Sequence, residues 1–163
     1  MCGILYLMNY KDTFLKIAVG KYNVNVKFDK KRYFDAEVRR DIMLNHHFFE
    51  TIHLKDIKNT KHLAIAFHEL GHTIQEDYNY LITRYFKVKF RFKDIVTYHI
   101  IKEEFNAWKR AKEVSPIWNN TMNNMFIVSM NSYIKNWQTD WKTKINRKRH
   151  QRLLNLDNPY FNV

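Results

Sequence analysis

Two histidines stand four residues apart in the segment His68-Glu69-Leu70-Gly71-His72, and a glutamate follows the first of them. On a helix, side chains at positions i and i+4 lie one above the other on the same face. Two imidazoles at that spacing can bind one tetrahedral zinc ion, and the glutamate can act as a base on a zinc-bound water. The motif therefore predicts a hydrolytic metal site with His68 and His72 as ligands and Glu69 as general base.

The apolar residues around the same helix favour a metal site over a pair of core histidines. At about 100° per residue, His72 lies about 40° from His68, whereas the apolar stripe lies about 100–160° away on the other side. That stripe consists of Leu63, Phe67, Leu70 and Ile74. Structural core histidines are expected inside the apolar stripe, and these two lie outside it.

A zinc site also needs a third protein ligand, and two adjacent carboxylates, Glu103 and Glu104, stand on a second expected helix. On the helical wheel Glu104 lies at the centre of an apolar arc, whereas Glu103 lies about 100° away at its edge. A buried carboxylate is costly without a partner, and a bound cation removes that cost. We therefore expect Glu104 as the third ligand, with Glu103 as the alternative ligand. A salt bridge from Glu104 to an Arg or Lys is the alternative explanation of its burial.

Together, His68-Glu69-x-x-His72 and Glu104-Phe-Asn-Ala107 resemble the gluzincins, the thermolysin-like branch of the zinc metallopeptidases. More closely, they resemble the minimal bacterial and phage members of the ImmA/IrrE type. The resemblance covers roughly residues 10–114 and implies a zinc metalloendopeptidase, a hydrolase acting on a restricted protein or peptide substrate. It also suggests a phage or mobile element as the source.

The resemblance further implies where a substrate binds. An edge strand before the active-site helix pairs with an extended substrate in such peptidases, and residues 39–45 stand at the matching place. The candidate substrate-binding residues are Leu44, Asn45 and His99. Larger gluzincins stabilise the transition state with a Tyr or His, for which this chain offers His99, Tyr98, Tyr80 and Tyr85.

The elements that must position these residues form an α+β chain. Helical spacing predicts helices over 4–18, 60–79 and 95–114, and one long or two shorter helices over 119–155. Alternation of apolar and polar residues predicts strands over 22–28 and 86–93, and a shorter strand is expected over 39–45. Gly71 inside a helix costs about 1 kcal/mol relative to Ala, which predicts close packing against the Glu104 helix.

We expect two parts along the chain. Residues 1–114 form a minimal zincin-like domain, with a small, mainly antiparallel sheet packed on the active-site helix and on a second, Glu-bearing helix. Residues 115–163 form a basic helical extension packed on the same domain.

Composition limits the class of protein. The 163 residues are 45% hydrophobic, which suffices for one domain with a core, and a single Cys2 forms no internal disulfide. No apolar run approaches the roughly 18–20 residues that span a bilayer, so we expect no membrane span. The first residues lack the features of a signal peptide, so we expect a cytoplasmic protein, with release by lysis left open.

The net charge of +12 favours polyanionic partners. The densest basic segment offers six side chains to phosphates: Lys142, Lys144, Arg147, Lys148, Arg149 and Arg152. The alternative interpretation is a solvated helix in a basic chain. The competing function is that of a catalytically silent zincin-fold protein that binds a protein or nucleic-acid partner. An intact Glu69 favours the peptidase, and the sequence predicts no oligomeric state.

Overall fold

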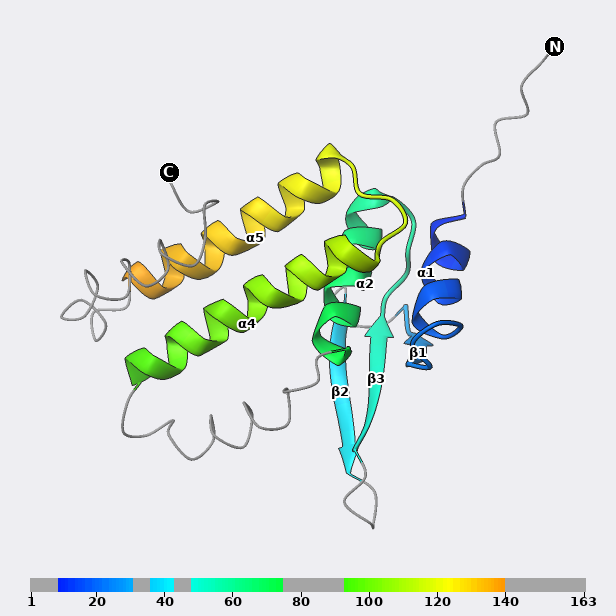
Figure 1. The fold of residues 1–163 in the computed structure, drawn as a ribbon, viewed down its shortest axis with the longest axis horizontal. Coiled ribbons are helices and arrows are strands. Elements are labelled where there is room, and N and C mark those ends of the chain that lie inside the picture. The colour runs from blue at the N-terminus through cyan, green and yellow to red at the C-terminus, as the bar shows by residue number, and fades with distance from the viewer. Residues whose placement is uncertain (1–8, 31–35, 43–47, 75–92, 140–163) are drawn as a thin grey trace.

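The computed structural model describes residues 9–30, 36–42, 48–74 and 93–139 (Figure 1). Along the chain, the elements are α1 (Tyr10–Ala18), β1 (Asn25–Phe28), β2 (Ala36–Ile42), β3 (Phe48–Leu54), α2 (Thr60–Thr73), α4 (Lys93–Val114) and α5 (Asn120–Thr139). In the described ranges, one helix precedes three consecutive strands, and helices follow. The expected α+β class is therefore confirmed.

In the part of the chain that the structure describes, the sheet has three strands in the order β1-β3-β2. β2 pairs with β3 antiparallel, whereas β1 pairs with β3 in parallel. The expectation of a mainly antiparallel sheet thus holds for one of the two pairings, and the sheet is mixed. Alternation along a strand shows which face is buried but carries no information about the direction of the neighbouring strand, which explains the error.

The central strand β3 was not predicted. Thr51 and Ile52 are consecutive and both buried, so the sheet is covered on both faces at this point. A strand buried on both faces loses the alternation of apolar and polar residues that identifies a half-buried strand. β2 begins and ends three residues before the expected residues 39–45, and it lies at an edge of the sheet as expected.

The other predicted elements agree with the structure where it describes them. In residues 22–28 the half-buried and exposed side chains alternate as predicted, although β1 pairs only from Asn25 onward. The helix predicted over 95–114 is α4. The strand predicted over 86–93 lies outside the described residues except for Lys93, which begins α4.

Asparagine side chains set the beginnings of two helices. The side chain of Asn9 accepts hydrogen bonds from the backbone N–H groups of Lys11 and Asp12, so α1 begins at Tyr10 and not at residue 4. Asn59 accepts from His62 in the same way at the start of α2. These bonds satisfy donors that have no partner within the helix.

Helix α2 occupies the centre of the molecule. It contacts α1, β2 and β3, and it also contacts α4 and α5 (Figure 1). Its buried residues cover a little more than half of the helix circumference at about 100° per residue; they are Leu63, Ala64, Ala66, Phe67, His68, Leu70 and Gly71. The apolar stripe and the histidine stripe are therefore both covered by other elements, and the histidines are withdrawn from solvent although they lie outside the apolar stripe.

Helices α4 and α5 run antiparallel beside each other (Figure 1). Trp108 of α4 shares one core with Met122, Phe126 and Met130 of α5. The described part of residues 115–163 thus packs on the same core as the rest of the chain, while the proposed boundary after residue 114 stays a prediction. In the described ranges, no helix is both long enough and apolar enough to span a bilayer.

Gly71 lies at the point where α2 crosses α4. A Cβ atom at this position would overlap with the carbonyl oxygen of Ala107. Both residues are fully buried or nearly so, and the overlapping atoms belong to the backbone, which cannot turn aside as a flexible side chain can. The expected packing role of Gly71 is confirmed.

We expect Gly71→Ala to destabilise the protein, although the same substitution in an open helix stabilises it. The helix gains up to about 1 kcal/mol from the change, but separating the two backbones costs more, since overpacking a core costs about 1–3 kcal/mol. Urea denaturation followed by circular dichroism measures the difference. Asn124→Ala, at an exposed position of α5, is the control and leaves the midpoint nearly unchanged. A Gly71→Ala variant as stable as the control would show that the crossing tolerates a methyl group.

Candidate metal centre

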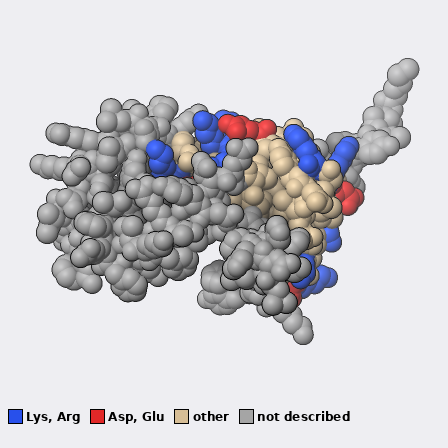
Figure 2. All heavy atoms as spheres, turned by 60° about the horizontal axis from the view of Figure 1, so that its bottom comes forward, with Lys and Arg blue, Asp and Glu red and all other residues tan. Residues whose placement is uncertain are grey.

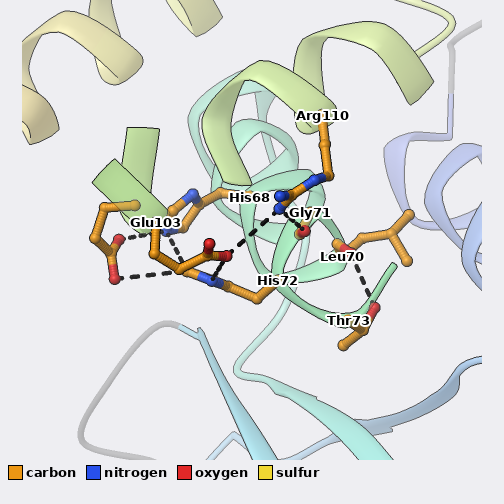
Figure 3. A network of polar contacts seen from close by, with 8 residues as sticks. His68, Leu70, Gly71, His72, Thr73, Glu103 and Arg110 are labelled. Atoms are coloured by element: carbon orange, nitrogen blue, oxygen red, sulfur yellow. Dashed lines mark hydrogen bonds and ion pairs between the residues drawn. The ribbon is translucent and has the colours of Figure 1, made fainter. Parts of the chain in front are cut away.

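Three predicted ligand side chains meet where α2 crosses α4. His68 and His72 extend from α2 (Figure 3), and Glu104 belongs to α4. Nε2 of His68 lies 3.2 Å from Nε2 of His72 and 3.1 Å from Oε2 of Glu104. Nε2 of His72 lies 3.6 Å from Oε1 of Glu104. These three residues form a group that can hold a metal ion.

The separations of the ligand atoms fit a small tetrahedral ion. Ligand atoms about 2.0–2.1 Å from a tetrahedral zinc ion lie about 3.3 Å from one another. The distances of 3.2 Å between the two Nε2 atoms and 3.1 Å from His68 to Oε2 of Glu104 lie near that value, and His72 contacts the other oxygen of Glu104 at 3.6 Å. One potential ligand atom from each residue lies within 4.8 Å of the others. The group therefore needs little rearrangement to bind an ion.

The partners of Glu104 also fit a cation site. Its side chain is 16% exposed, and its Oε2 atom has no hydrogen-bond partner in the described part of the chain, although His68 lies at ion-pair distance. No described Arg or Lys pairs with Glu104, so the alternative explanation of its burial by such a salt bridge finds no support. A cation would satisfy an oxygen that is otherwise buried at a cost.

The charges of the group raise the pKa of His72 and lower the pKa of Glu104. Burial acts to lower the pKa of His72, but the carboxylates of Glu103 and Glu104 outweigh burial and raise this pKa from 6.5 to about 10. Burial acts to raise the pKa of Glu104, but His68 and His72 hold it well below its usual range. Without a metal ion, His72 therefore carries a proton that an ion would have to displace.

Glu103 contacts the same histidine from another direction. Its Oε1 lies 3.7 Å from Nδ1 of His72 and 3.4 Å from a guanidinium nitrogen of Arg110. That nitrogen also donates a hydrogen bond to the backbone oxygen of Gly71, at 3.0 Å (Figure 3). The two adjacent carboxylates thus differ in their contacts: Glu104 meets the Nε2 atoms of both histidines, and Glu103 meets Nδ1 of one.

An aromatic ring supports His68. The indole of Trp108 stacks on the imidazole, with ring centroids 4.3 Å apart and planes inclined by 21°. Phe126 stacks on Trp108 at 5.7 Å. The Nδ1 atom of His68 is buried and has no hydrogen-bond partner in the described ranges. In many metal sites a hydrogen bond to this second nitrogen orients the imidazole, whereas here the stacked indole holds the ring.

Tyr133 of α5 reaches the site and was missed by the sequence analysis. Burial and the nearby carboxylates of Glu104 and Glu69 raise the pKa of its hydroxyl. The signal was present, because Tyr133 continues the buried stripe of Met122, Phe126 and Met130 at spacings of four, four and three residues. Glu69 lies close enough to act electrostatically on both Tyr133 and His72.

Other predicted site residues lie outside the described part of the chain. These are Leu44, Asn45, Tyr80, Tyr85 and the six basic residues between 142 and 152. His99 and Tyr98 lie in α4, but their side chains are outside the described ones. On the face in Figure 2, the described Lys and Arg side chains lie at several separate places, and the described carboxylates lie between some of them.

Comparison with known proteins finds no family model, no curated protein and no solved structure that matches this chain. The function of the protein is therefore inferred from the arrangement of the site.

The charges of the site predict how the stability of the metal-free protein depends on pH. A raised histidine pKa contributes stability that is complete below pH 6.5 and is lost as the pH rises towards about 10. The lowered pKa of Glu104 contributes stability above pH 4.5, which is lost in more acidic solution. Denaturation midpoints of chelator-treated protein should fall between pH 6.5 and 10. The variant His72→Gln should not show that fall, and an equal fall in both proteins would contradict the assignment.

Proposed function

We propose that this protein is a zinc-dependent metallopeptidase of the gluzincin type. The observation that carries the proposal is the convergence of His68 and His72 with Glu104 at distances that fit a metal ion. Glu69 lies beside the group, and its charge acts on His72. Two imidazoles, one carboxylate and a nearby second carboxylate form the set of groups that metal-assisted hydrolysis of peptide bonds requires.

Zinc is the metal we propose, because two imidazole nitrogens and one carboxylate are a ligand set that suits it. When bound, zinc lowers the pKa of a coordinated water towards about 7 and polarises a carbonyl group. His68, His72 and Glu104 would hold the ion. Their burial keeps bulk water away from two of the three ligands, since His68 and His72 are 9% and 12% exposed.

Glu69 would move the proton in this reaction. As general base it accepts a proton from the attacking water, and as general acid it returns that proton to the leaving amine. It follows His68 directly in α2, so the helix that carries two of the ligands also fixes the position of the base. A silent relative that only binds a partner has no need of a carboxylate here.

Tyr133 would stabilise the negative charge that develops on the carbonyl oxygen of the substrate. A tyrosine hydroxyl is ordinarily protonated at neutral pH, and here burial and two carboxylates raise its pKa further. It therefore remains a hydrogen-bond donor throughout the neutral range. Its side chain is 37% exposed, so the ring borders both the buried ligands and the solvent from which a substrate arrives.

The edge position of β2 supports binding of an extended peptide. β3 occupies one side of β2, and no described strand pairs with the other side. Backbone groups at a free edge can hydrogen-bond to an added strand, which suits a substrate recognised partly by its main chain. A restricted protein substrate inside a cell, and a phage or mobile-element source, belong to the same proposal.

Two variants separate metal binding from catalysis. Wild type should hold one zinc ion per chain by elemental analysis, and Glu104→Gln should lose most of it. Glu69→Gln should retain the metal but hydrolyse peptides at least about 100-fold more slowly, since a general base contributes about 10²–10⁴-fold. Cleavage is measured by mass spectrometry on a mixed-sequence peptide library.

The outcomes distinguish the candidate functions. Wild type without zinc, even after metal is supplied, would overturn the proposal. Zinc-loaded wild type whose cleavage equals that of Glu69→Gln would favour the silent zincin-fold protein, with a protein or nucleic acid as its partner.

Removal of the Tyr133 hydroxyl should slow the reaction without emptying the site. We expect Tyr133→Phe to lower kcat about 100-fold, the usual loss when one donor to a developing oxyanion is removed. KM and zinc content should stay close to wild type. Ser132→Ala, the neighbouring exposed hydroxyl, is the control. An unchanged kcat in Tyr133→Phe would remove this residue from the mechanism.

A further inference from the structure

The contacts of Glu103 suggest a function that differs from the binding of metal. Its side chain is only 14% exposed, although it lies at the edge of the apolar arc of α4. A carboxylate in such a place needs a reason, because burial of a charge is costly without partners. Both of its charged partners in the described part of the chain, His72 and Arg110, belong to the crossing of α2 and α4.

His72 lies between the two adjacent carboxylates. Its Nε2 atom faces Oε1 of Glu104 at 3.6 Å. Its Nδ1 atom faces Oε1 of Glu103 at 3.7 Å (Figure 3). Consecutive residues on a helix point about 100° apart, so α4 can address both nitrogens of one ring from two neighbouring positions. At 3.7 Å the Glu103 contact is an ion pair, and it becomes a hydrogen bond only if the groups approach by some tenths of an ångström.

This arrangement selects which nitrogen of His72 is available to a metal. A carboxylate beside Nδ1 favours the proton there, which leaves the lone pair on Nε2. Nε2 is the nitrogen that faces His68 and Glu104. A carboxylate that accepts from the far nitrogen also makes the imidazole a stronger donor to the metal.

Arg110 fixes the position of the Glu103 carboxylate. One guanidinium nitrogen contacts Glu103 at 3.4 Å and donates to the backbone oxygen of Gly71 at 3.0 Å. Gly71 precedes His72 in α2, so the same arginine connects the carboxylate to the backbone next to the ring that the carboxylate faces. The positive charge also offsets the burial of Glu103.

We propose that Glu103 is a positioning residue for the metal centre, and that Arg110 holds it in place. Glu103 keeps the proton of His72 on Nδ1, so that the lone pair of Nε2 is available to bind the ion. Glu103 does not bind the ion itself. The inference rests on the proposed metal site and deepens it, because it distinguishes the roles of two adjacent glutamates that the sequence alone leaves as alternative ligands.

The test compares the zinc affinity of Glu103→Gln with that of wild type, by competition with a chromophoric chelator at one fixed pH. We expect one zinc per chain in both proteins, with a dissociation constant about 10–100-fold higher in the variant, the usual cost of losing such an outer partner. The visible spectrum of the cobalt-substituted variant should also change, since it reports the geometry around the ion. Glu113→Gln, an exposed carboxylate on the same helix, is the matched control and should change neither readout.

A second variant excludes an indirect effect of the charge left on Arg110. The double variant Glu103→Gln/Arg110→Gln leaves no lone charge at this pair, and it serves as the test if the single variant fails to fold. We expect its affinity to stay as low as that of Glu103→Gln. Recovery of wild-type affinity would show that Glu103 is only the counterion of Arg110, and would overturn the proposal.

The remaining outcomes separate this inference from the proposed function. Wild-type affinity in Glu103→Gln, with zinc bound to wild type, would overturn the positioning role alone. Loss of zinc from Glu103→Gln to the extent seen in Glu104→Gln would make Glu103 a ligand, which also overturns it. A wild-type protein that binds no zinc would overturn both proposals.

Discussion

At the crossing of α2 and α4, Gly71 lies against the carbonyl of Ala107 with no room for a side chain. The backbones of the two helices thereby approach more closely than ordinary packing of larger side chains allows. His72 follows the contact on one helix, and Glu104 precedes it by one turn on the other. The distances between imidazole nitrogens and carboxylate oxygens depend on this approach, because each side chain extends from a backbone whose position the contact sets.

Charge balance is the second requirement of the crossing. Two glutamates of α4 are mostly buried there, and Glu69 acts on the same histidine from α2. Arg110 lies beside Glu103 and balances its charge, and the proton held by His72 balances the charge of Glu104 when no ion is present. A bound divalent cation would balance the charge of Glu104 in the same way, and the histidine nitrogens would then bind the cation in place of a proton. The charges of the group are therefore balanced in the absence of a metal ion, and a metal ion can still displace the proton of His72.

The candidate ligands could be identified from the sequence because the position of each depends on the pattern within one helix. The four-residue spacing of His68 and His72 and the place of Glu104 on its apolar arc are local properties. Periodicity places Tyr133 on the buried stripe of α5, but which helix faces that stripe depends on contacts between helices. Arg110 escaped for the same reason, because its contacts with Glu103 and with the backbone of Gly71 are not local. β3 escaped because a strand buried on both faces lacks alternation, and the parallel pairing of β1 escaped because direction is not encoded in the burial pattern.

The stack of Trp108 on His68 has an optical consequence. An indole is a fluorophore, and here it touches an imidazole that can bind an ion. A paramagnetic ion such as Cu²⁺ or Co²⁺ on that imidazole would lie within the range over which such ions quench indole emission. The tryptophan beneath the ligand therefore gives the protein a built-in fluorescent reporter of whether the centre is filled, without an attached dye.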